Sequence, residues 1–449
     1  MSKLNIMSFG GTVDNSDNSI PFSAALKAIK NTNGGTLFIP KGIWRTGPLE
    51  IFSNTTLILD EEAVISFIPE LTLYPPVWTR WEGVECYAMH PCMFATGQEN
   101  ITISGKGTID GGGSSWWDIA KEKKSRPQNL PELPPELELA RLNEGYDKQP
   151  GGGGGRACQF LRPPLLQFFN CKNILLKDFT LQNSPFWTLH PVYCTNLVIC
   201  GLYITNPHNA PNTDGIDIDS CEDVLVENCN VSVGDDGIAL KSGSGEDGIK
   251  TAKPTRRVTV RGCSVKDGHG GIVIGSETAA GIFDVLAEDC VFKGTDRGIR
   301  IKTRRGRGGT IENLEFKNLV MENNLCPLAI NMFYRCGADS TDNCFNQEAL
   351  PVNKATPLIK NIRISDIRAT DCRSSAAFIA GLPEAPVENL HIQRCEFSTD
   401  ENSGISPDES EMFLGIPSVT EKSIRLLNVK NPIFDNVHVH GPAQSFING

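Results

Sequence analysis

The sequence predicts an all-β chain wound into a right-handed parallel β-helix, a solenoid whose successive coils pair in parallel. Three observations support this prediction: one pattern recurs eight times, its apolar residues fall at fixed alternating positions, and Gly, Asn and Asp interrupt the runs. Recurrence at intervals of roughly 20–50 residues is typical of solenoids. Helical repeats would need longer amphipathic runs, so short strands fit better.

Each copy of the pattern is recognised by its first residue. Positions one, three, six and eight after that residue are nearly all apolar, as in Ile174, Leu176, Phe179 and Leu181 of the first copy. Alternation indicates strands with one buried face, and the change of parity after position three requires a bend between two short strands. A sandwich fits less well, because its strands would reverse. The copies start at Asn173, Asn196, Asp223, Arg257, Asp284, Asn313, Asn361 and Asn389.

Two further features belong to the ends of such a solenoid. Open ends are strand edges that invite aggregation, and residues 20–30 read as an amphipathic helix that would cap the first coil. Segments 35–40, 56–59 and 101–103 read as early coils with less regular spacing. We therefore expect a single domain over residues 1–449.

One stretch, from about residue 121 to residue 161, breaks the pattern. It contains a Pro-rich segment over 130–141 that predicts a short helix, and five consecutive glycines, Gly151–Gly155. Such a glycine run imposes little order. Because coils resume directly afterwards, we expect an insertion near the cleft, anchored by residues 162–164; a linker between domains is the alternative.

Composition narrows the compartment and the partners. The net charge of −11 argues against nucleic acid. No run approaches the roughly 18 apolar residues of a membrane span, and the first residues lack a secretory signal. We expect a cytoplasmic protein, or a periplasmic or secreted one if a signal was removed. The 15 cysteines lack metal-binding spacing and read mainly as buried thiols. Composition does not predict an oligomeric state.

A second pattern is shared by four consecutive coils, each with a residue, a glycine and then an alternating strand. Stacking these phrases would place Asp214 over Asp236, with Asp235 beside them and His269 one coil beyond Asp235. Neighbouring strands lie about 4.8 Å apart. Arg300 and Lys302 would follow on the outer face. The four phrases are Asp214–Asp219, Asp236–Lys241, Gly270–Gly275 and Arg297–Lys302.

The predicted outer strip therefore carries three carboxylates, an imidazole and two cations. Stacked carboxylates repel one another, so at least one should have a raised pKa. A protonated acid beside ionised carboxylates is suited to glycoside cleavage. A Ca²⁺ site is the competing interpretation of the carboxylates. The cations would bind an anionic ligand, and Arg304, Arg305 and Arg307 either extend this basic patch or form a mobile basic loop.

These residues resemble the polygalacturonase family of glycoside hydrolases (family 28). The family's four signatures are matched in order, and the phrase Asn183–Pro191 is similar to the family as well. The matches are Asn212-Thr-Asp-Gly215, Gly234-Asp-Asp236, Gly268-His-Gly270 and Arg300-Ile-Lys302.

The resemblance implies roles residue by residue. Asp235 would be the general acid, and Asp214 and Asp236 would share the hydrolytic water as base. His269 would support the acid and position the substrate. The substrate-binding residues, including those that would bind the galacturonate carboxylate, are Asn212, Arg300, Lys302 and Tyr334. The family inverts the anomeric centre and needs no metal or other cofactor, although carboxylates one coil apart would by spacing alone favour retention.

The resemblance also implies a pectic oligosaccharide or polysaccharide as substrate. Because the insertion at about 121–161 precedes the catalytic coils and would close one end of a groove, we expect exo action on α-1,4-linked oligogalacturonides. Hydrolysis of rhamnogalacturonan or xylogalacturonan is the alternative within the family. A Ca²⁺-dependent pectate lyase and a non-catalytic carbohydrate-binding β-helix are alternatives from other classes.

Overall fold

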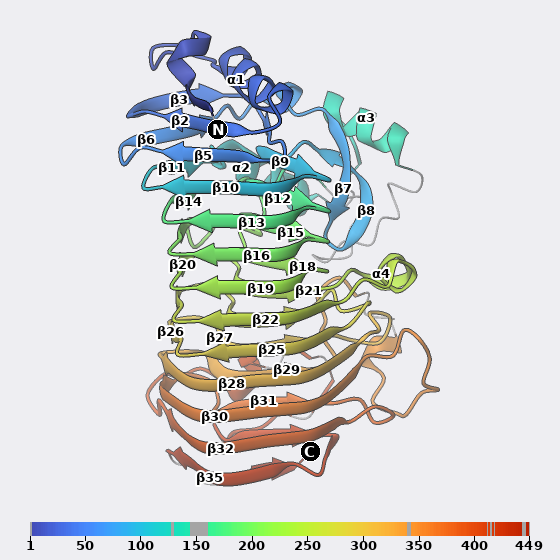
Figure 1. Cartoon of the computed structure of the whole chain (residues 1–449). Helices are drawn as coiled ribbons and strands as arrows, with labels where there is room; N and C mark the ends of the chain where they lie inside the picture. The colour runs from blue at the N-terminus through green and yellow to red at the C-terminus, as the bar shows by residue number, and fades with distance from the viewer. Residues whose placement is uncertain are drawn as a thin grey trace. The chain divides into compact units, whose positions relative to one another are not determined.

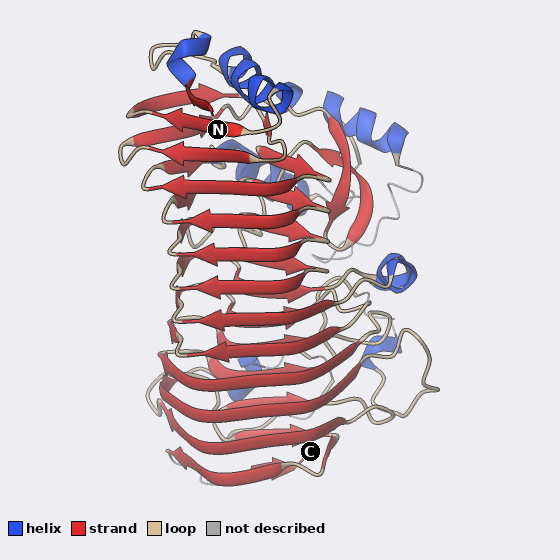
Figure 2. Ribbon diagram, viewed as in Figure 1, coloured by secondary structure: helices blue, strands red, loops and turns tan. Residues whose placement is uncertain are grey.

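The computed structural model describes residues 2–126, 130–143, 160–338, 343–410, 412–413, 415–416, 418–441 and 446–448. Contacts divide the described chain into two compact units. Unit 1 contains the residues up to Asp235 except 82–84, and unit 2 contains 82–84 and the residues from Asp236 onward. Figure 1 shows rungs of parallel strands within each unit, and Figure 2 shows that strands predominate over helices in both.

Unit 1 consists of coils in which strands at the same position pair in parallel. The first column is β1 (Ser2–Asn5), β2 (Gly35–Ile39), β5 (Thr55–Leu59), β10 (Glu99–Gly105), β13 (Lys172–Lys177), β16 (Thr195–Cys200) and β19 (Glu222–Glu227). The second is β3 (Gly42–Thr46), β6 (Ala63–Phe67), β11 (Thr108–Asp110), β14 (Thr180–Gln182), β17 (Tyr203–Thr205) and β20 (Asn230–Ser232). The third is β4 (Leu49–Glu50), β9 (Met93–Thr96), β12 (Leu166–Phe169), β15 (Leu189–Val192) and β18 (Ile216–Asp219).

Unit 2 repeats this arrangement with longer strands toward the C-terminus. Its first two columns are β22 (Thr255–Arg261), β23 (Ser264–Lys266), β25 (Ile282–Glu288), β26 (Val291–Lys293), β28 (Thr310–Glu322), β30 (Leu358–Cys372), β32 (Val387–Thr399), β34 (Val429–Lys430) and β35 (Ile433–His440). The third is β21 (Asp236–Lys241), β24 (Gly270–Gly275), β27 (Arg297–Lys302), β29 (Cys326–Asn331), β31 (Ala377–Ala380), β33 (Ile424–Leu427) and β36 (Phe446–Asn448). The predicted parallel β-helix is confirmed; that it forms one domain stays a prediction.

The eight predicted repeat starts share one backbone conformation. Each has a φ between 55° and 60°, in the left-handed region that Asn and Asp tolerate better than most residues. The amide of Asn196 also donates to Asn173 Oδ1 at 3.1 Å, and that of Asn389 to Asn361 Oδ1 at 2.9 Å, so the turn residue of one coil bonds to the next. Turn conformation and amide stacking together explain why the pattern begins with these residue types.

The apolar columns line the core as expected. In unit 1, Ile174 pairs with Leu197, which pairs with Val224, and all three are buried. The same column in unit 2 runs from Val258 through Val285. The four cysteines at position six, Cys229, Cys263, Cys290 and Cys395, are buried as thiols, and no disulfide joins the described cysteines.

Helix α1 (Ser19–Asn31) confirms the predicted cap. It buries Phe22, Leu26 and Ile29 and contacts β2, β3 and β4 of the first coils. Among the helices of the described chain, none has both the length and the apolarity to cross a lipid bilayer. The remaining short helices outside the inserted stretch are η1 (Ile6–Phe9), η2 (Leu71–Leu73), α4 (Gly245–Thr251), η4 (Asn343–Phe345) and η5 (Pro407–Ser410).

The inserted stretch contains two helices, α2 (Ser114–Ser125) and α3 (Pro134–Leu142). Helix α3 matches the predicted helix. Helix α2 begins before the predicted insertion, and the sequence analysis missed it because most of its residues are polar. Lys123 of α2 pairs with Glu136 of α3 at 3.0 Å, and both side chains are buried. Gly151–Gly155 lies outside the described residues.

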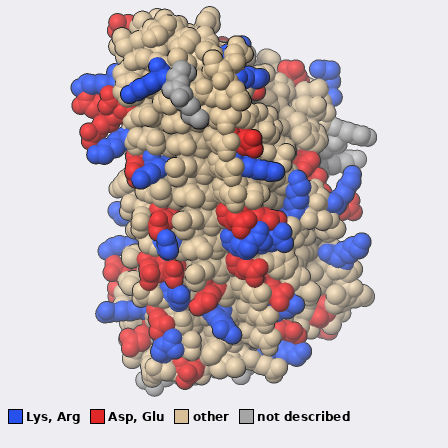
Figure 3. Space-filling model, in the orientation of Figure 1, with Lys and Arg blue, Asp and Glu red and all other residues tan. Residues whose placement is uncertain are grey.

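The outer surface carries charges of both signs. Figure 3 shows acidic and basic side chains intermingled on the visible face. In unit 2, Lys317 pairs with Glu288 at 2.9 Å, and Lys430 with Glu388 at 2.9 Å, each across neighbouring coils. Such exposed pairs contribute about 0–1 kcal/mol each. Stability must therefore come mainly from the apolar core.

Candidate active site

In unit 1, the segment before β18 holds Asp214 in a rigid setting. Thr188 donates its backbone N–H to the carbonyl of Asp214 at 2.8 Å, and the Asp214 side chain is only 3% exposed. The neighbouring Asn212 has a φ of 54° and accepts from the guanidinium of buried Arg162 at 3.1 Å. Arg162 also donates to the carbonyl of Pro211 at 2.7 Å, so it fixes Asn212, the first residue of the motif, and the residue before it.

The Gly234-Asp-Asp motif is tied to the same segment. Gly234 N donates to Thr213 Oγ1 at 3.3 Å, and a Cβ at Gly234 would lie 2.4 Å from the carbonyl oxygen of Ala210. Only glycine fits this close approach. As a result, one carboxylate oxygen of Asp214 and one of Asp235 lie within 4.8 Å of each other. The predicted juxtaposition of these two acids is present in unit 1.

In unit 2, Asp236 is buried among cations. Arg300 Nη1 donates to Asp236 Oδ1 at 2.9 Å, and Lys302 Nζ donates to Oδ2 at 2.5 Å. The Asp236 side chain is 1% exposed. Burial alone would raise the pKa of Asp236, but the charges of Lys302, Arg300 and Lys241 outweigh it and hold the pKa well below its usual range. Asp236 is therefore not the carboxyl with the raised pKa that stacking predicts.

The Gly-His-Gly motif supplies the strand that lies between these partners. Register places Gly270 of β24 between Asp236 of β21 and Arg297 of β27. A Cβ at Gly270 would lie 3.5 Å from Cδ of Arg300 and 2.4 Å from Cγ2 of Val273. The missing side chain thus avoids a clash with Val273, while Arg300 passes β24 at ordinary contact distance. His269 directly precedes this position and is exposed.

Tyr334 completes the group in unit 2. Its ring centroid lies 5.6 Å from Cζ of Arg300 and 5.4 Å from Nζ of Lys302. At these distances the ring attracts both cations through its negative face. Burial is the largest cause that raises the pKa of Tyr334 well above its usual range, so its hydroxyl stays protonated. The structure thus brings together Asp236, Arg300, Lys302 and Tyr334.

The basic residues after Lys302 form internal pairs. Arg305 Nε donates to Glu384 Oε1 at 2.6 Å. Arg307 Nη1 donates to Ser244 Oγ at 2.6 Å, and its side chain is buried. Arg304 Nη1 donates to the carbonyl of Cys336 at 2.6 Å. These hydrogen bonds attach the three arginines to other segments of unit 2. The alternative of a mobile basic loop stays a prediction.

A buried carboxylate that the sequence reading missed lies in the same unit. Glu277 Oε2 is 3.0 Å from Lys241 Nζ, and Glu277 Oε1 is 3.4 Å from Arg307 Nη1. Burial opposes ionisation, but Lys241, Arg307 and Lys302 lower the pKa of Glu277 to about 2. No motif pointed to Glu277; the alternating apolar pattern ends just before it.

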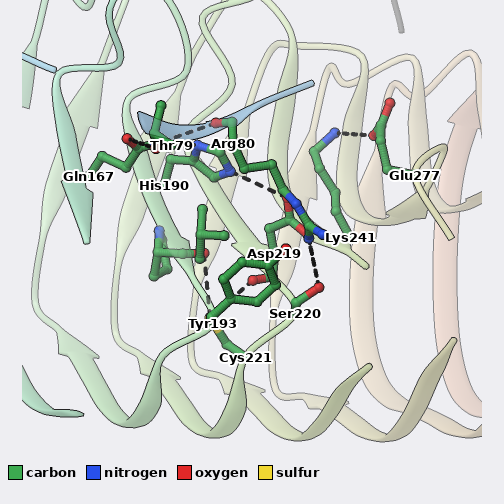
Figure 4. A network of polar contacts seen from close by, with 12 residues as sticks. Thr79, Arg80, Gln167, His190, Tyr193, Asp219, Ser220, Cys221, Lys241 and Glu277 are labelled. Atoms are coloured by element: carbon green, nitrogen blue, oxygen red, sulfur yellow. Dashed lines mark hydrogen bonds and ion pairs between the residues drawn. The ribbon is translucent and has the colours of Figure 1, made fainter. Parts of the chain in front are cut away.

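A second buried network in unit 1 was also missed. Arg80 of β7 (Pro76–Trp81) donates to Asp219 Oδ1 at 2.9 Å and to Ser220 Oγ at 2.8 Å. Thr79 donates to Gln167 Oε1 at 2.7 Å, and Gln167 Nε2 lies 2.9 Å from His190 Nδ1. Figure 4 shows these side chains converging beneath the β7 ribbon; it also draws the Lys241–Glu277 pair of unit 2.

This network fastens a hairpin to the coils. β7 pairs with β8 (Val84–Met89) in a separate two-stranded sheet. Because Thr79 and Arg80 bind the outward side chains of β12 and β18, β7 lies over the outer face of these strands. His190 comes from the phrase Asn183–Pro191, so part of that phrase serves to hold the hairpin.

Clustered carboxylates raise the question of a metal ion. Asp214 and Asp235 have the spacing that a hard cation would accept. However, both carboxylate oxygens of Asp236 bind cationic side chains, and the positive charge of Arg300 and Lys302 would oppose a metal ion near it. The surroundings of Asp236 in unit 2 therefore suit an anionic ligand better than Ca²⁺.

Comparisons with known proteins support the sequence resemblance. The family profile described as "Glycosyl hydrolases family 28" matches residues 152–405, more than half of the chain. A "Probable polygalacturonase" of Vitis vinifera is 30% identical over 398 residues, which cover 86% of this chain and 72% of that protein. An "Exo-poly-alpha-D-galacturonosidase" of Dickeya chrysanthemi is 27% identical over 421 residues, covering 90% of this chain and 68% of its own.

A solved structure agrees with these relatives. The crystal structure of a hyperthermoactive exopolygalacturonase from Thermotoga maritima superposes with a TM-score of 0.76 at 29% identity, covering 97% of this chain and 92% of that one. The chain therefore belongs to glycosyl hydrolases family 28 and is a hydrolase of the polygalacturonase type.

Proposed function

We propose that this protein is an exo-acting galacturonidase that removes terminal units from α-1,4-linked oligogalacturonides by inversion. The observation that carries the substrate assignment is the pair of buried cations, Arg300 and Lys302, beside the ring of Tyr334. An arginine has five N–H donors and a lysine three, so binding Asp236 uses only part of their capacity. Both cations can also donate to the carboxylate of a galacturonate unit, which the phenol hydroxyl of Tyr334 would help to orient.

The acids are assigned roles that suit their settings. Asp235 is half-buried and would protonate the leaving oxygen, while Asp214 and Asp236 would hold and activate the water. His269 is exposed directly before β24 and would support the acid and contact the substrate. A substrate carboxylate that draws Arg300 and Lys302 away from Asp236 would raise the pKa of Asp236 and make it a better base.

Exo action is supported by the hairpin of unit 1. Asp214 lies just before β18, and β7 covers the outer face of β12 and β18 through the contacts of Thr79 and Arg80. A polymer that extended along this face from Asp214 would meet the chain's own hairpin. Helix α3 contacts β7 and backs it from outside. The names of the Thermotoga maritima and Dickeya chrysanthemi proteins agree with this mode.

The first experiment follows products over time on polygalacturonate and on defined oligogalacturonides. Exo action predicts that monomer or one short product accumulates from the start, whereas early products of mixed length would refute it. Saturated products in the presence of a chelator would separate hydrolysis from Ca²⁺-dependent lysis. On rhamnogalacturonan and xylogalacturonan fragments we expect little or no product.

The second experiment replaces the proposed acid. Asp235→Asn should lower turnover by about 10²-fold or more, as expected for loss of a general acid. The variant should keep the thermal unfolding of the parent, because Asp235 is partly exposed. An Asp235→Asn variant as active as the parent would remove this assignment of the general acid. A parent that binds pectic oligosaccharides without cleaving them would instead favour a purely binding protein.

The stereochemical outcome needs its own measurement. Retaining enzymes place their two carboxyl groups about 5–5.5 Å apart and inverting enzymes about 6.5–9.5 Å. The short approach of Asp214 and Asp235 taken alone would fit retention. We assign inversion because the family resemblance covers all four motifs. Proton NMR of the first-formed product decides: inversion of an α-linkage gives the β-anomer, and an initial α-anomer would overturn the assignment.

A further inference from the structure

A hollow on unit 1 is lined largely by aromatic rings. Its volume is about 430 Å³, and we call it the aromatic pocket. The lining residues are Glu50, Pro76, Val77, Trp78, Tyr87, His90, Phe94, Thr96 and Phe169. They come from β4, β9 and β12 of successive coils and from the hairpin β7–β8. Ligand sites typically measure roughly 300–1,000 Å³, so the aromatic pocket has the size of a small-molecule site.

The pocket is separate from the acids of unit 1. In the third column of strands, β9 and β12 are followed by β15 and then by β18, which Asp214 precedes. With strands about 4.8 Å apart, the pocket lies roughly 10–15 Å from the β18 coil. The network of Thr79 and Arg80 stands between them. The pocket and the acidic site therefore lie at different positions along the unit.

The rings of the pocket pack against one another in pairs. Trp78 is 48% exposed, and its ring meets Tyr87 edge-on, with centroids 5.2 Å apart and planes at 75°. His90 and Phe94 meet in the same way at 5.5 Å and 77°. Edge-to-face packing of this kind fixes the orientation of the rings.

Folding does not require an exposed tryptophan at this position. The hairpin is fastened by the next two residues, Thr79 and Arg80, which are buried and hydrogen-bonded. Trp78 leaves nearly half its surface in water. An exposed aromatic beside a hollow is a typical feature of a binding site.

Polar groups at the rim define which ligand fits. Glu50 and Thr96 are exposed at the mouth and offer a carboxylate and a hydroxyl. His90 Nδ1 lies 2.6 Å from the carbonyl of Pro91, which makes Nδ1 the donor and Nε2 an acceptor. Burial lowers the pKa of His90, so the ring is neutral near pH 7. None of the described lining residues is a Lys or Arg, and Glu50 gives the pocket a negative charge.

We propose that the aromatic pocket binds an uncharged sugar residue of a glycan. The apolar C–H face of a sugar ring would lie on Trp78, and its hydroxyls would bond to Glu50, Thr96 and His90. The negative charge of Glu50 disfavours a uronate, which would need a cation as partner. This inference goes beyond the proposed hydrolysis. The acidic site, which contains Asp214 and Asp235, would act on charged sugar units, whereas the aromatic pocket would bind neutral ones. A neighbouring hollow of about 720 Å³ beside α1 shares Glu50 and His90, so the bound chain can extend beyond one unit.

Affinity electrophoresis of the full chain tests the proposal. Gels would contain β-1,4-galactan, arabinan or polygalacturonate, each with and without saturating galacturonic acid, which can occupy the acidic site but has no glycosidic bond to cleave. We expect retardation in at least one neutral-glycan gel, undiminished by galacturonic acid. Trp78→Ala should weaken this binding roughly 10-fold, as expected for loss of a stacked ring. Trp78→Phe should keep most of it.

Two further variants make the outcome decisive. Tyr203→Ala removes an aromatic that is 58% exposed elsewhere on unit 1 and should leave retardation unchanged. Thr96→Arg fills the mouth from an exposed position and should abolish it. Both Trp78→Ala and Thr96→Arg should hydrolyse trigalacturonate at the parent's rate, which shows that they fold.

Three results would overturn the inference. The first is that neither neutral glycan retards the parent. The second is that the parent and both pocket variants are retarded equally. The third is that Trp78→Ala is no longer retarded by polygalacturonate but is still retarded by the neutral glycans. Failure of the proposed hydrolase function would show up differently, as absence of trigalacturonate cleavage by the parent.

Discussion

Replacing Glu277 by glutamine gives the sharpest test of the energetics of unit 2. The carboxylate is 3% exposed and lies 3.0 Å from Lys241 and 3.4 Å from Arg307. Its pKa falls from an ordinary 4.5 to about 2. One pKa unit corresponds to about 1.4 kcal/mol, so ionised Glu277 contributes about 3 kcal/mol to the free energy of unfolding.

The sign of the pH dependence follows from the direction of the shift. A carboxyl with a lowered folded pKa stabilises the protein fully above its unfolded value of about 4.5, and this contribution is lost as the pH falls toward 2. About 2 of the 3 kcal/mol should be gone by pH 3. Glu277→Gln leaves Lys241 and Arg307 buried without their carboxylate, which costs about 3–5 kcal/mol at pH 7.

The assay is urea unfolding of parent and variant between pH 7 and pH 3. The difference in free energy of unfolding isolates Glu277, because the other acids titrate in both proteins. We expect this difference to narrow by about 2 kcal/mol on acidification. Glu322→Gln is the control, since Glu322 pairs with Lys293 at 2.7 Å on the surface, and it should unfold like the parent. A difference that stays constant with pH would refute the assigned pKa.

Two further predictions concern the other buried charges. Arg80→Met should lower the free energy of unfolding by about 3–5 kcal/mol, because it leaves the fully buried Asp219 carboxylate without its arginine. Arg394→Met, which breaks an exposed pair, should lower it hardly at all in the same chemical unfolding assay. Equal losses in the two variants would contradict the argument. Lys302→Met should raise the pKa of Asp236 and so move the acid limb of the kcat/KM profile upward by about 1–3 pH units. An acid limb at the parent's position would show that Asp236 need not be ionised.

The repeat was predictable from sequence because its physical requirement recurs at every coil. Each coil must bury positions one, three, six and eight, and each must turn through the left-handed region at its first residue. Even Arg257, which is unusual at a turn with a φ of 55°, was located correctly by the phase of its neighbours. The four motifs were found for the same reason, since each lies at one end of a short strand: before β18, at the start of β21 and of β24, and at the end of β27.

The sequence did not reveal which partners the long charged side chains bind. Arg300 was expected to face a ligand, yet its guanidinium also reaches Asp236 on a strand two positions away. Arg305 and Arg307 looked like an open basic patch, but their partners, Glu384 and Glu277, are distant in sequence or carry no motif. The hairpin contact of Arg80 with Asp219 spans 139 residues and has no periodic signal.

These buried pairs make the site part of the scaffold. In a solenoid each coil contacts only its neighbours, so stability is approximately a sum over coil interfaces. Asp236 on β21 bonds to Arg300 and Lys302 on β27 across the glycine of β24, and therefore joins two interfaces at once. If a substrate carboxylate takes over either cation, that link must weaken at the moment when Asp236 gains basicity. A ligand that does not engage Arg300 or Lys302 would leave their bonds to Asp236 intact, and Asp236 would remain a weak base. Removing the carboxylate from the substrate should therefore lower turnover more than it lowers affinity.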